Sequence, residues 1–361
     1  MSDPEMTRLS ASRIKTAKEC SWKYWCKYKL KLPDLSNDGA SRGTICHLVL
    51  ELLCIPKRKK YYNKVIKSQD IFAVPSVKKL VEIWAKKLNV DDPENMDLIK
   101  SMTLNGLEYD YFGSKIGKVS EEYSEKKFDI VVDEGEKRYH INGFIDKLFL
   151  YKKQGVALIR DFKTSKEVFK GSEVDNNLQD LFYSLATKTM FPEYNQRQCE
   201  FIFLKFDLGN NLLGESGEGV LEMRPLSNEE LEGFEYELTE WQNYLDNFDE
   251  DNAKENYAYD RGFPPSGSGF CDRLQCGFAT YPGELKKDGN PKWHCSFKFS
   301  FEYWLLKDEN GNPKGSAYLD DKDSLIEKLQ EGYTIEKMKY DGCPRHNQYS
   351  NNEEIEDEFT L

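Results

Sequence analysis

Hydrophobic positions recur along this chain with two periods, and each period predicts a different kind of element. Helical spacing predicts helices at 10–31, 44–54, 76–90, 95–113, 174–190, 227–248 and 322–332. Runs of β-branched and aromatic residues predict strands at 126–133, 137–150, 155–163, 197–206 and 219–224. The polar segment 36–43 is expected to be a loop, and 296–306 a strand or a short helix. This order of elements predicts an α/β fold with a mixed β core inside helical framing.

The composition predicts one main domain and a polar extension. We expect a single domain over 1–306, with a helical insertion at about 60–120, the core at about 126–224 and loop-rich, cysteine-bearing segments at 265–300. The remainder, 307–361, is expected to be a polar extension with an acidic tail. No apolar run is long enough to span a membrane, and no signal peptide is evident at the N-terminus. We therefore expect an intracellular, cytoplasmic protein with no membrane partner and with reduced or metal-bound cysteines.

Charge is distributed unevenly along the sequence. The formal net charge of −12 argues against a nucleic-acid partner, but 13–31 holds seven basic residues and one acidic residue, interleaved with aromatic side chains. Such a segment is typical of contact with phosphates and stacked bases, so Arg13 and Lys15 are candidate substrate-binding residues. A solvated, lysine-rich helix face is the alternative.

Two aspartates, separated by fourteen residues, lie at or near the ends of apolar, strand-like runs. Soluble proteins seldom bury carboxylates there without a partner. Side chains alternate along a strand, so Asp161 and Lys163 lie on one face, and a hairpin would bring Asp146 beside them. Two carboxylates and a lysine predict a site for a hard divalent cation and a phosphate. For each aspartate taken alone, a structural hydrogen-bonding role is the alternative.

Further candidates lie on the predicted helices before and after these strands. His47 stands one turn before Glu51, and an imidazole ligand would shift the preference of the site toward Mn²⁺. Gln179 and Tyr183 lie one turn apart and flank the buried face of the later helix. Glu51 is a candidate partner of His47, a ligand for a second ion, or a solvated residue.

These motifs, in this order, resemble those of the PD-(D/E)XK nuclease superfamily, in particular its RecB-like branch, which includes CRISPR-associated and helicase-linked exonucleases. The resemblance covers about 8–206 and, less closely, 265–305. It implies a restriction-endonuclease-like core with a mixed central sheet flanked by helices. It also implies a hydrolytic site that binds Mg²⁺ or Mn²⁺, with metal ligands and catalytic residues among His47, Asp146, Asp161 and Lys163. Gln179 and Tyr183 would border this site and contact substrate.

The activity that the resemblance implies is hydrolysis of phosphodiester bonds in DNA. We expect an exonuclease that acts on single strands or DNA ends in repair, recombination or replication. A non-catalytic DNA-binding or assembly protein on the same fold is the alternative, with the acidic tail at 353–361 docking a protein partner. A small-molecule metallohydrolase would use the same chemistry.

Several RecB-like nucleases carry a [4Fe–4S] cluster held by one cysteine before the core and three after it. The resemblance therefore makes Cys20, Cys271, Cys276 and Cys295 candidate ligands. A zinc site that uses His294 with the last three of these cysteines is an alternative, and so are unligated buried thiols. The sequence assigns no role to Cys343.

Overall fold

The computed structural model describes residues 6–34, 37–209, 217–260, 276–277, 280–287, 289 and 291–346. The chain forms two compact units. The first comprises Met1–Ala11 and Ser36–Asn243, and the second comprises Ser12–Leu35 and Tyr244–Leu361. Each unit is therefore built from two separate stretches of sequence. Among the described residues, no helix is both long and apolar enough to cross a bilayer.

A five-stranded mixed sheet, in the order β1-β2-β3-β4-β5, forms the centre of the first unit. Its strands are β1 (Glu121–Glu134), β2 (Lys137–Tyr151), β3 (Val156–Lys163), β4 (Gln196–Phe203) and β5 (Val220–Glu222). Neighbouring strands are antiparallel except for β3 and β4, which are parallel. The helix α8 (Leu178–Met190) lies between these two strands in sequence and provides the crossover that a parallel pair requires. The predicted α/β class is confirmed.

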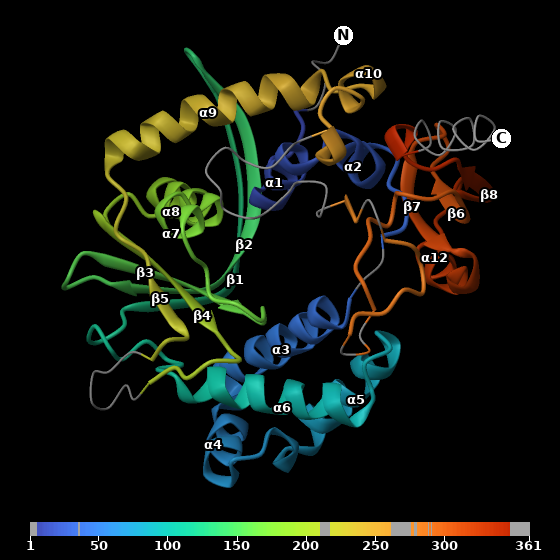
Figure 1. Cartoon of the computed structure of the whole chain (residues 1–361). Helices are drawn as coiled ribbons and strands as arrows, with labels where there is room; N and C mark the ends of the chain where they lie inside the picture. The colour runs from blue at the N-terminus through green and yellow to red at the C-terminus, as the bar shows by residue number, and fades with distance from the viewer. Residues whose placement is uncertain are drawn as a thin grey trace, which may run out of the picture. The chain divides into compact units, whose positions relative to one another are not determined.

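Helices lie on both faces of this sheet. Figure 1 shows α8 on one side of the strands and α3 (Asp38–Cys54) with α6 (Pro93–Glu108) on the other. The remaining long helices of this unit are α4 (Lys59–Ser68), α5 (Pro75–Lys87) and most of α9 (Asn228–Asp246), and α7 (Ser172–Asp175) is a single turn. Short 3-10 turns occur at Pro56–Arg58 and Ile71–Ala73. The helix α4 lies within the helical insertion expected at about 60–120, although no individual helix was predicted over these residues.

The expected loop at 36–43 is wrong over most of its length, because α3 begins at Asp38. The side chain of Asn37 accepts a hydrogen bond from the Ala40 backbone N–H and caps the helix. Packing favours glycine at position 43, because a Cβ atom there would lie only 2.9 Å from Thr164 Oγ1. Glycine thus lets α3 approach the end of β3 closely, although a polar, glycine-containing segment reads as a loop.

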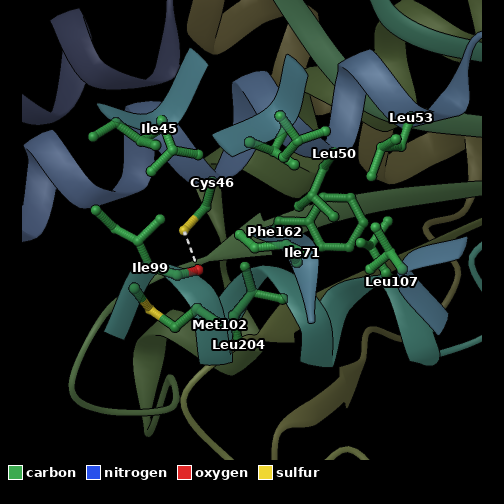
Figure 2. Close-up of a cluster of buried hydrophobic side chains, with 14 of the residues drawn as sticks. Ile45, Cys46, Leu50, Leu53, Ile71, Ile99, Met102, Leu107, Phe162 and Leu204 are labelled. Carbon is green, nitrogen blue, oxygen red and sulfur yellow. Dashed lines mark hydrogen bonds between the residues drawn. The ribbon is translucent and has the colours of Figure 1, made fainter. Parts of the chain in front are cut away.

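The main hydrophobic core holds α3 and α6 against the sheet. Figure 2 shows Cys46 and Leu50 of α3 packed among side chains of α6, with Phe162 of β3 and Leu204 in the same cluster. Cys46 Sγ lies 3.9 Å from the Ile99 backbone oxygen, to which it donates a weak hydrogen bond. This packing fixes the position of α3 relative to β3, and with it the side chains that α3 projects towards the sheet.

The second unit combines N-terminal helices with a small antiparallel sheet. The predicted helix 10–31 is divided into α1 (Ala11–Glu19), α2 (Ser21–Tyr24) and a π-helical turn at Trp25–Lys29, with Cys20 in an extended conformation between the first two. The sheet has the order β7-β6-β8, formed by β6 (Phe301–Lys307), β7 (Pro313–Tyr318) and β8 (Thr334–Tyr340).

Short helices complete the second unit. They are α10 (Glu250–Ala253) and α12 (Asp323–Ile326), with 3-10 turns at Ala258–Asp260 and Leu319–Asp321. Of the predicted helix 322–332, only α12 forms. The indole Nε1 of Trp22 donates a hydrogen bond of 2.8 Å to Tyr340 OH, which donates to the Phe297 carbonyl oxygen at 2.8 Å. These bonds join the N-terminal helices of the unit to its last strand.

Candidate active site

The candidate site lies where β2 and β3 separate. The two strands pair from Tyr151 with Val156 as far as Lys147 with Arg160, and no further pair follows. Asp146 is the next residue of β2, at the opening of this fork. Its Oδ2 atom accepts a hydrogen bond of 2.8 Å from the Phe162 backbone N–H. The carboxylate of Asp146 thus bridges the diverging strands through their own backbone.

Asp161 is buried in β3 beside two residues of α8. Its Oδ1 atom accepts hydrogen bonds from Gln179 Nε2 at 2.7 Å and from Tyr183 OH at 2.9 Å. The side chain of Asn177 caps α8 by accepting from the backbone N–H groups of Gln179 and Asp180, which fixes the first turn of this helix. Gln179 and Tyr183, which lie one helical turn apart, therefore both donate hydrogen bonds to the same carboxylate oxygen of Asp161.

Lys163 closes the same network. Its Nζ atom lies 2.6 Å from Asp161 Oδ2 and donates a hydrogen bond of 2.6 Å to Gln179 Oε1. Burial and the charge of Asp146 raise the pKa of Asp161, whereas the ammonium group of Lys163 opposes this rise. The lysine is thus held beside the carboxylates, with its charge compensated mainly by Asp161.

His47 reaches the fork from α3. Its Nδ1 atom lies 3.4 Å from Asp146 Oδ2, and its Nε2 atom lies 3.1 Å from the Phe162 carbonyl oxygen. Nε2 donates to that carbonyl when it is protonated, which leaves Nδ1 facing the carboxylates as a ligand atom. Burial on its own would lower the pKa of His47, but the hydrogen bond and charge of Asp146 raise it to about 9.

Glu125 is a site residue that the sequence analysis missed. One ligand atom from each of His47, Glu125 and Asp146 lies within 4.8 Å of the others. Burial and the charge of Asp146 raise the pKa of Glu125 to about 7. Its backbone φ is +47°, a left-handed conformation that is unusual for a glutamate within a strand. A signal was present in the short connection between the strands predicted at 126–133 and 137–150, because the register of such a hairpin continues to place residue 125 opposite residue 146.

The donor set fits a hard divalent cation. Carboxylate oxygens are the ligands that Mg²⁺ and Mn²⁺ prefer, and one imidazole is compatible with Mn²⁺. Asp161 Oδ2 is buried and is compensated by the Lys163 ammonium 2.6 Å away. The carboxylate of Asp161 therefore adds negative charge beside the group formed by His47, Glu125 and Asp146.

The other predicted substrate-binding residues belong to the second unit. Arg13 and Lys15 lie on α1, and the Arg13 guanidinium group stacks over the Tyr28 ring at 5.0 Å. Their contact with substrate stays a prediction.

Four cysteines of the second unit line one cavity. Cys20 directly precedes α2, Cys276 and Cys295 lie between α10 and β6, and Cys343 follows β8. Cys271 lies outside the described residues, and His294 does not line this cavity. Burial raises the pKa of Cys295 to about 12 and that of Cys343 to about 11. The structure thus brings together three of the predicted ligands with the unassigned Cys343.

The spacing of these sulfur atoms bears on the zinc alternative. Within the described ranges, no three cysteine sulfurs lie within 4.8 Å of one another. Tetrahedral zinc, with Zn–S bonds of about 2.3 Å, would hold its sulfurs closer together than this. The described cysteines are therefore not arranged for a single tetrahedral zinc ion.

Comparison with known proteins gives one family. A family model described as the PD-(D/E)XK nuclease superfamily matches residues 8–281. No curated protein matches the chain. A solved structure titled "Crystal structure of SSO0001" is 17% identical, and the alignment covers 57% of this chain and 80% of that chain with a TM-score of 0.26. The family match spans both the fork and the strands that form it.

Proposed function

Because this chain belongs to the PD-(D/E)XK nuclease superfamily, we propose that it is a Mg²⁺- or Mn²⁺-dependent deoxyribonuclease. We further propose that it is an exonuclease of the RecB-like branch, acting on single strands or DNA ends in repair, recombination or replication. The observation that carries this proposal is the fork, where the ligand atoms of His47, Glu125 and Asp146 gather beside the ion pair of Asp161 and Lys163.

Each side chain at the fork has a task that follows from its contacts. His47, Glu125, Asp146 and Asp161 would hold the cation, which polarises the scissile phosphate and lowers the pKa of a bound water. Lys163 is oriented by Gln179 Oε1 and by Asp161, so its charge is available to a phosphate that gains negative charge during attack. Tyr183 and Gln179 keep the Asp161 carboxylate fixed and restrict it to one orientation.

The electrostatics of the metal-free site support cation binding. Burial and the charge of Asp146 raise the pKa values of Glu125 and Asp161, and His47 is protonated at neutral pH. A divalent cation replaces these protons and removes the repulsion, so its binding is coupled to proton release.

The test is degradation of end-labelled DNA by the purified protein. Single strands and duplexes labelled at either end should be shortened in Mg²⁺ or Mn²⁺ but not in EDTA, and Asp161→Ala should abolish the reaction. Circular single strands separate exonuclease from endonuclease activity, because only the latter cuts them. Salt-sensitive DNA binding with no turnover in either metal would instead favour the non-catalytic alternative.

A second proposal concerns the cysteine-lined cavity. We propose that it holds a [4Fe–4S] cluster, with Cys20, Cys276 and Cys295 as ligands and Cys343 in the fourth position that the sequence analysis gave to Cys271. The cavity that these four cysteines share supports this choice.

The cluster proposal is tested by colour and iron content. Protein purified without oxygen should absorb broadly in the violet region, and dithionite should bleach this band. Cys343→Ala should lower the iron content, whereas the matched variant Cys271→Ala should not. The reverse result would restore Cys271 as the ligand, and a colourless, iron-free wild-type protein would contradict the cluster altogether.

A further inference from the structure

A group of cations lies at one edge of the central sheet, next to the fork but outside it. The parallel strands β3 and β4 pair along their whole length, and their last pair is Lys163 with Phe203. Parallel strands leave a sheet at the same edge, so the segments that follow them emerge side by side. Lys166 follows β3 and Lys205 follows β4. Both lysines therefore stand beyond the end of the strand that carries the hydrolytic lysine.

The backbone at this edge is held firmly. The Leu204 N–H donates a hydrogen bond of 2.8 Å to the Lys163 carbonyl oxygen. From α6, Asn105 Nδ2 donates to the carbonyl oxygens of Leu204 at 3.0 Å and Phe206 at 2.9 Å. Both neighbours of Lys205 are thus fixed, and its side chain extends from a rigid base.

The charges around Lys205 are positive. Partial burial lowers the pKa of Lys205, and the charges of Arg42 and Lys166 lower it further. Within the described part of the chain, neither Lys166 nor Lys205 has a carboxylate at ion-pair distance. Arg42 is 7% exposed, and its Nε atom has no hydrogen-bond partner among the described residues, although Nη1 donates to Asn95. In a chain with a net charge of −12, cations that gather despite their repulsion indicate an anionic ligand.

This group is continuous with the hydrolytic site. Gly43 of α3 lines the same cleft as His47 and Glu125. On its other side Gly43 abuts Thr164, since a Cβ there would lie 2.9 Å from Thr164 Oγ1. Thr164 lies between Lys163 and Lys166 in sequence. A strand of nucleic acid bound at the fork can therefore reach the cations without crossing another element of the sheet.

We propose that Lys166 and Lys205 bind a backbone phosphate of the substrate strand that neighbours the phosphate being hydrolysed. This inference rests on the proposed nuclease function and assigns its substrate contact. A lysine ammonium group binds a phosphate as a point charge on a flexible side chain. Contacts to backbone phosphates do not depend on the base sequence. The pair of lysines would thus set affinity and position along the strand, while chemistry stays at the fork.

The test measures DNA binding without hydrolysis. Wild type, Lys166→Gln/Lys205→Gln and Lys166→Arg/Lys205→Arg are titrated with a fluorescent single-stranded oligonucleotide in EDTA, over a series of salt concentrations. Loss of one phosphate contact should reduce the slope of log affinity against log salt by about 0.7. The glutamine variant should show this reduction, and the arginine variant should retain the wild-type slope. Lys153→Gln is the matched control, because this exposed lysine precedes the opposite end of β3.

An unchanged slope in the glutamine variant, or an equal change in Lys153→Gln, would overturn the proposal. Thermal unfolding checks that the variants are folded. Under turnover with Mg²⁺, the glutamine variant should raise KM and leave kcat within about twofold. If the wild-type protein binds DNA with the expected slope but never hydrolyses it, the phosphate contact stands and the nuclease proposal fails.

Discussion

Glu125 faces Asp146 across the β1–β2 hairpin. The pairs on either side are Ser124 with Lys147 and Lys126 with Ile145, so the two carboxylates occupy the intervening rung. Like charges directly opposite one another destabilise a sheet, and the left-handed φ of Glu125 adds about 1–2 kcal/mol of backbone strain. The arrangement is unfavourable for the fold alone and favourable for a cation.

Glu125→Gln is expected to weaken Mn²⁺ binding. The amide cannot supply an anionic oxygen, and affinity should fall by at least about tenfold, since losing only a hydrogen-bond partner of a metal ligand already costs about that much. Isothermal titration of the metal-free protein measures this. Glu51→Gln is the matched control, because Glu51 lines the same cleft outside the ligand group. Equal affinities for the two variants would remove Glu125 from the ligand set.

Glu125→Gly separates metal binding from folding. Glycine adopts a positive φ without strain, and its introduction removes the repulsion with Asp146. The metal-free variant is therefore expected to melt at a higher temperature than wild-type protein while binding Mn²⁺ more weakly. A lower Tm without metal would contradict the strain argument, and unchanged metal affinity would contradict the ligand assignment.

Metal affinity is expected to rise with pH up to about 9. In the metal-free protein the pKa of His47 is about 9 and that of Glu125 about 7, so at pH 7 a cation must displace protons. Between pH 7 and 9 the proton on His47 should change affinity by up to about tenfold per pH unit. Titration calorimetry in buffers of different ionisation enthalpy counts the protons released. His47→Asn should flatten the profile in this range, and an equally steep profile in the variant would refute the assignment.

The same pKa shift has a consequence for stability. A pKa raised on folding stabilises the native state below the unfolded value, near 6.5, and this contribution is lost as pH rises through about 9. Metal-free wild-type protein should therefore lose more stability between pH 7 and 9.5 than the His47→Asn variant does. Urea unfolding at the two pH values measures the difference, and parallel losses would show that His47 is not responsible.

Lys163→Gln is expected to lower kcat by about 10²–10³, the usual cost of removing one group that stabilises transition-state charge. Mn²⁺ affinity should change much less, because the lysine is not a ligand. Steady-state assays at saturating DNA measure kcat, with Lys153→Gln, in the turn that precedes β3, as the control. A large fall in metal affinity, with kcat recovered at high Mn²⁺, would show that Lys163 acts on the cation site instead.

The contact between Gly43 and Thr164 predicts a non-additive pair. Alanine is favoured over glycine in a helix by about 1 kcal/mol, but the clash with Thr164 Oγ1 should cost about 1–3 kcal/mol. Gly43→Ala should therefore not stabilise wild-type protein, whereas in a Thr164→Ala background it should stabilise by about 1 kcal/mol. Urea unfolding of the four proteins completes the cycle. Identical effects in both backgrounds would show that the contact is not tight.

The sequence predicted the parts of the fold and site that depend on local pattern. Alternation predicted that Asp161 and Lys163 share a face of β3, which agrees with the 2.6 Å between them. The expected hairpin agrees with the antiparallel pairing of β2 and β3, which places Asp146 beside Phe162. The one-turn spacing of Gln179 and Tyr183 agrees with their shared contact to Asp161. The start of α3 was missed because glycine and serine dominate its first turns, although Asn37 was a readable cap.

What the sequence did not predict depends on distant contacts. Glu125 lies just before the strand expected at 126–133, and its role follows only from the hairpin register and its unusual φ. Cys343 lies far along the chain from Cys20, and only the folded second unit brings both to one cavity. The strands β7 and β8 were not predicted within the expected polar extension, because β7 contains proline and glycine, β8 carries exposed lysine and glutamate side chains, and each strand has a single buried residue.

The bond between Trp22 and Tyr340 joins positions separated by 318 residues. During synthesis, all side chains of the fork leave the ribosome long before β8 does. The second unit can complete its fold only after β8 has been synthesised. Domains generally fold as units in the order in which they are synthesised. A chain that terminates before Tyr340 would carry all of the hydrolytic residues but would leave the Trp22 indole N–H without its acceptor. Premature termination would therefore first destabilise the N-terminal helices.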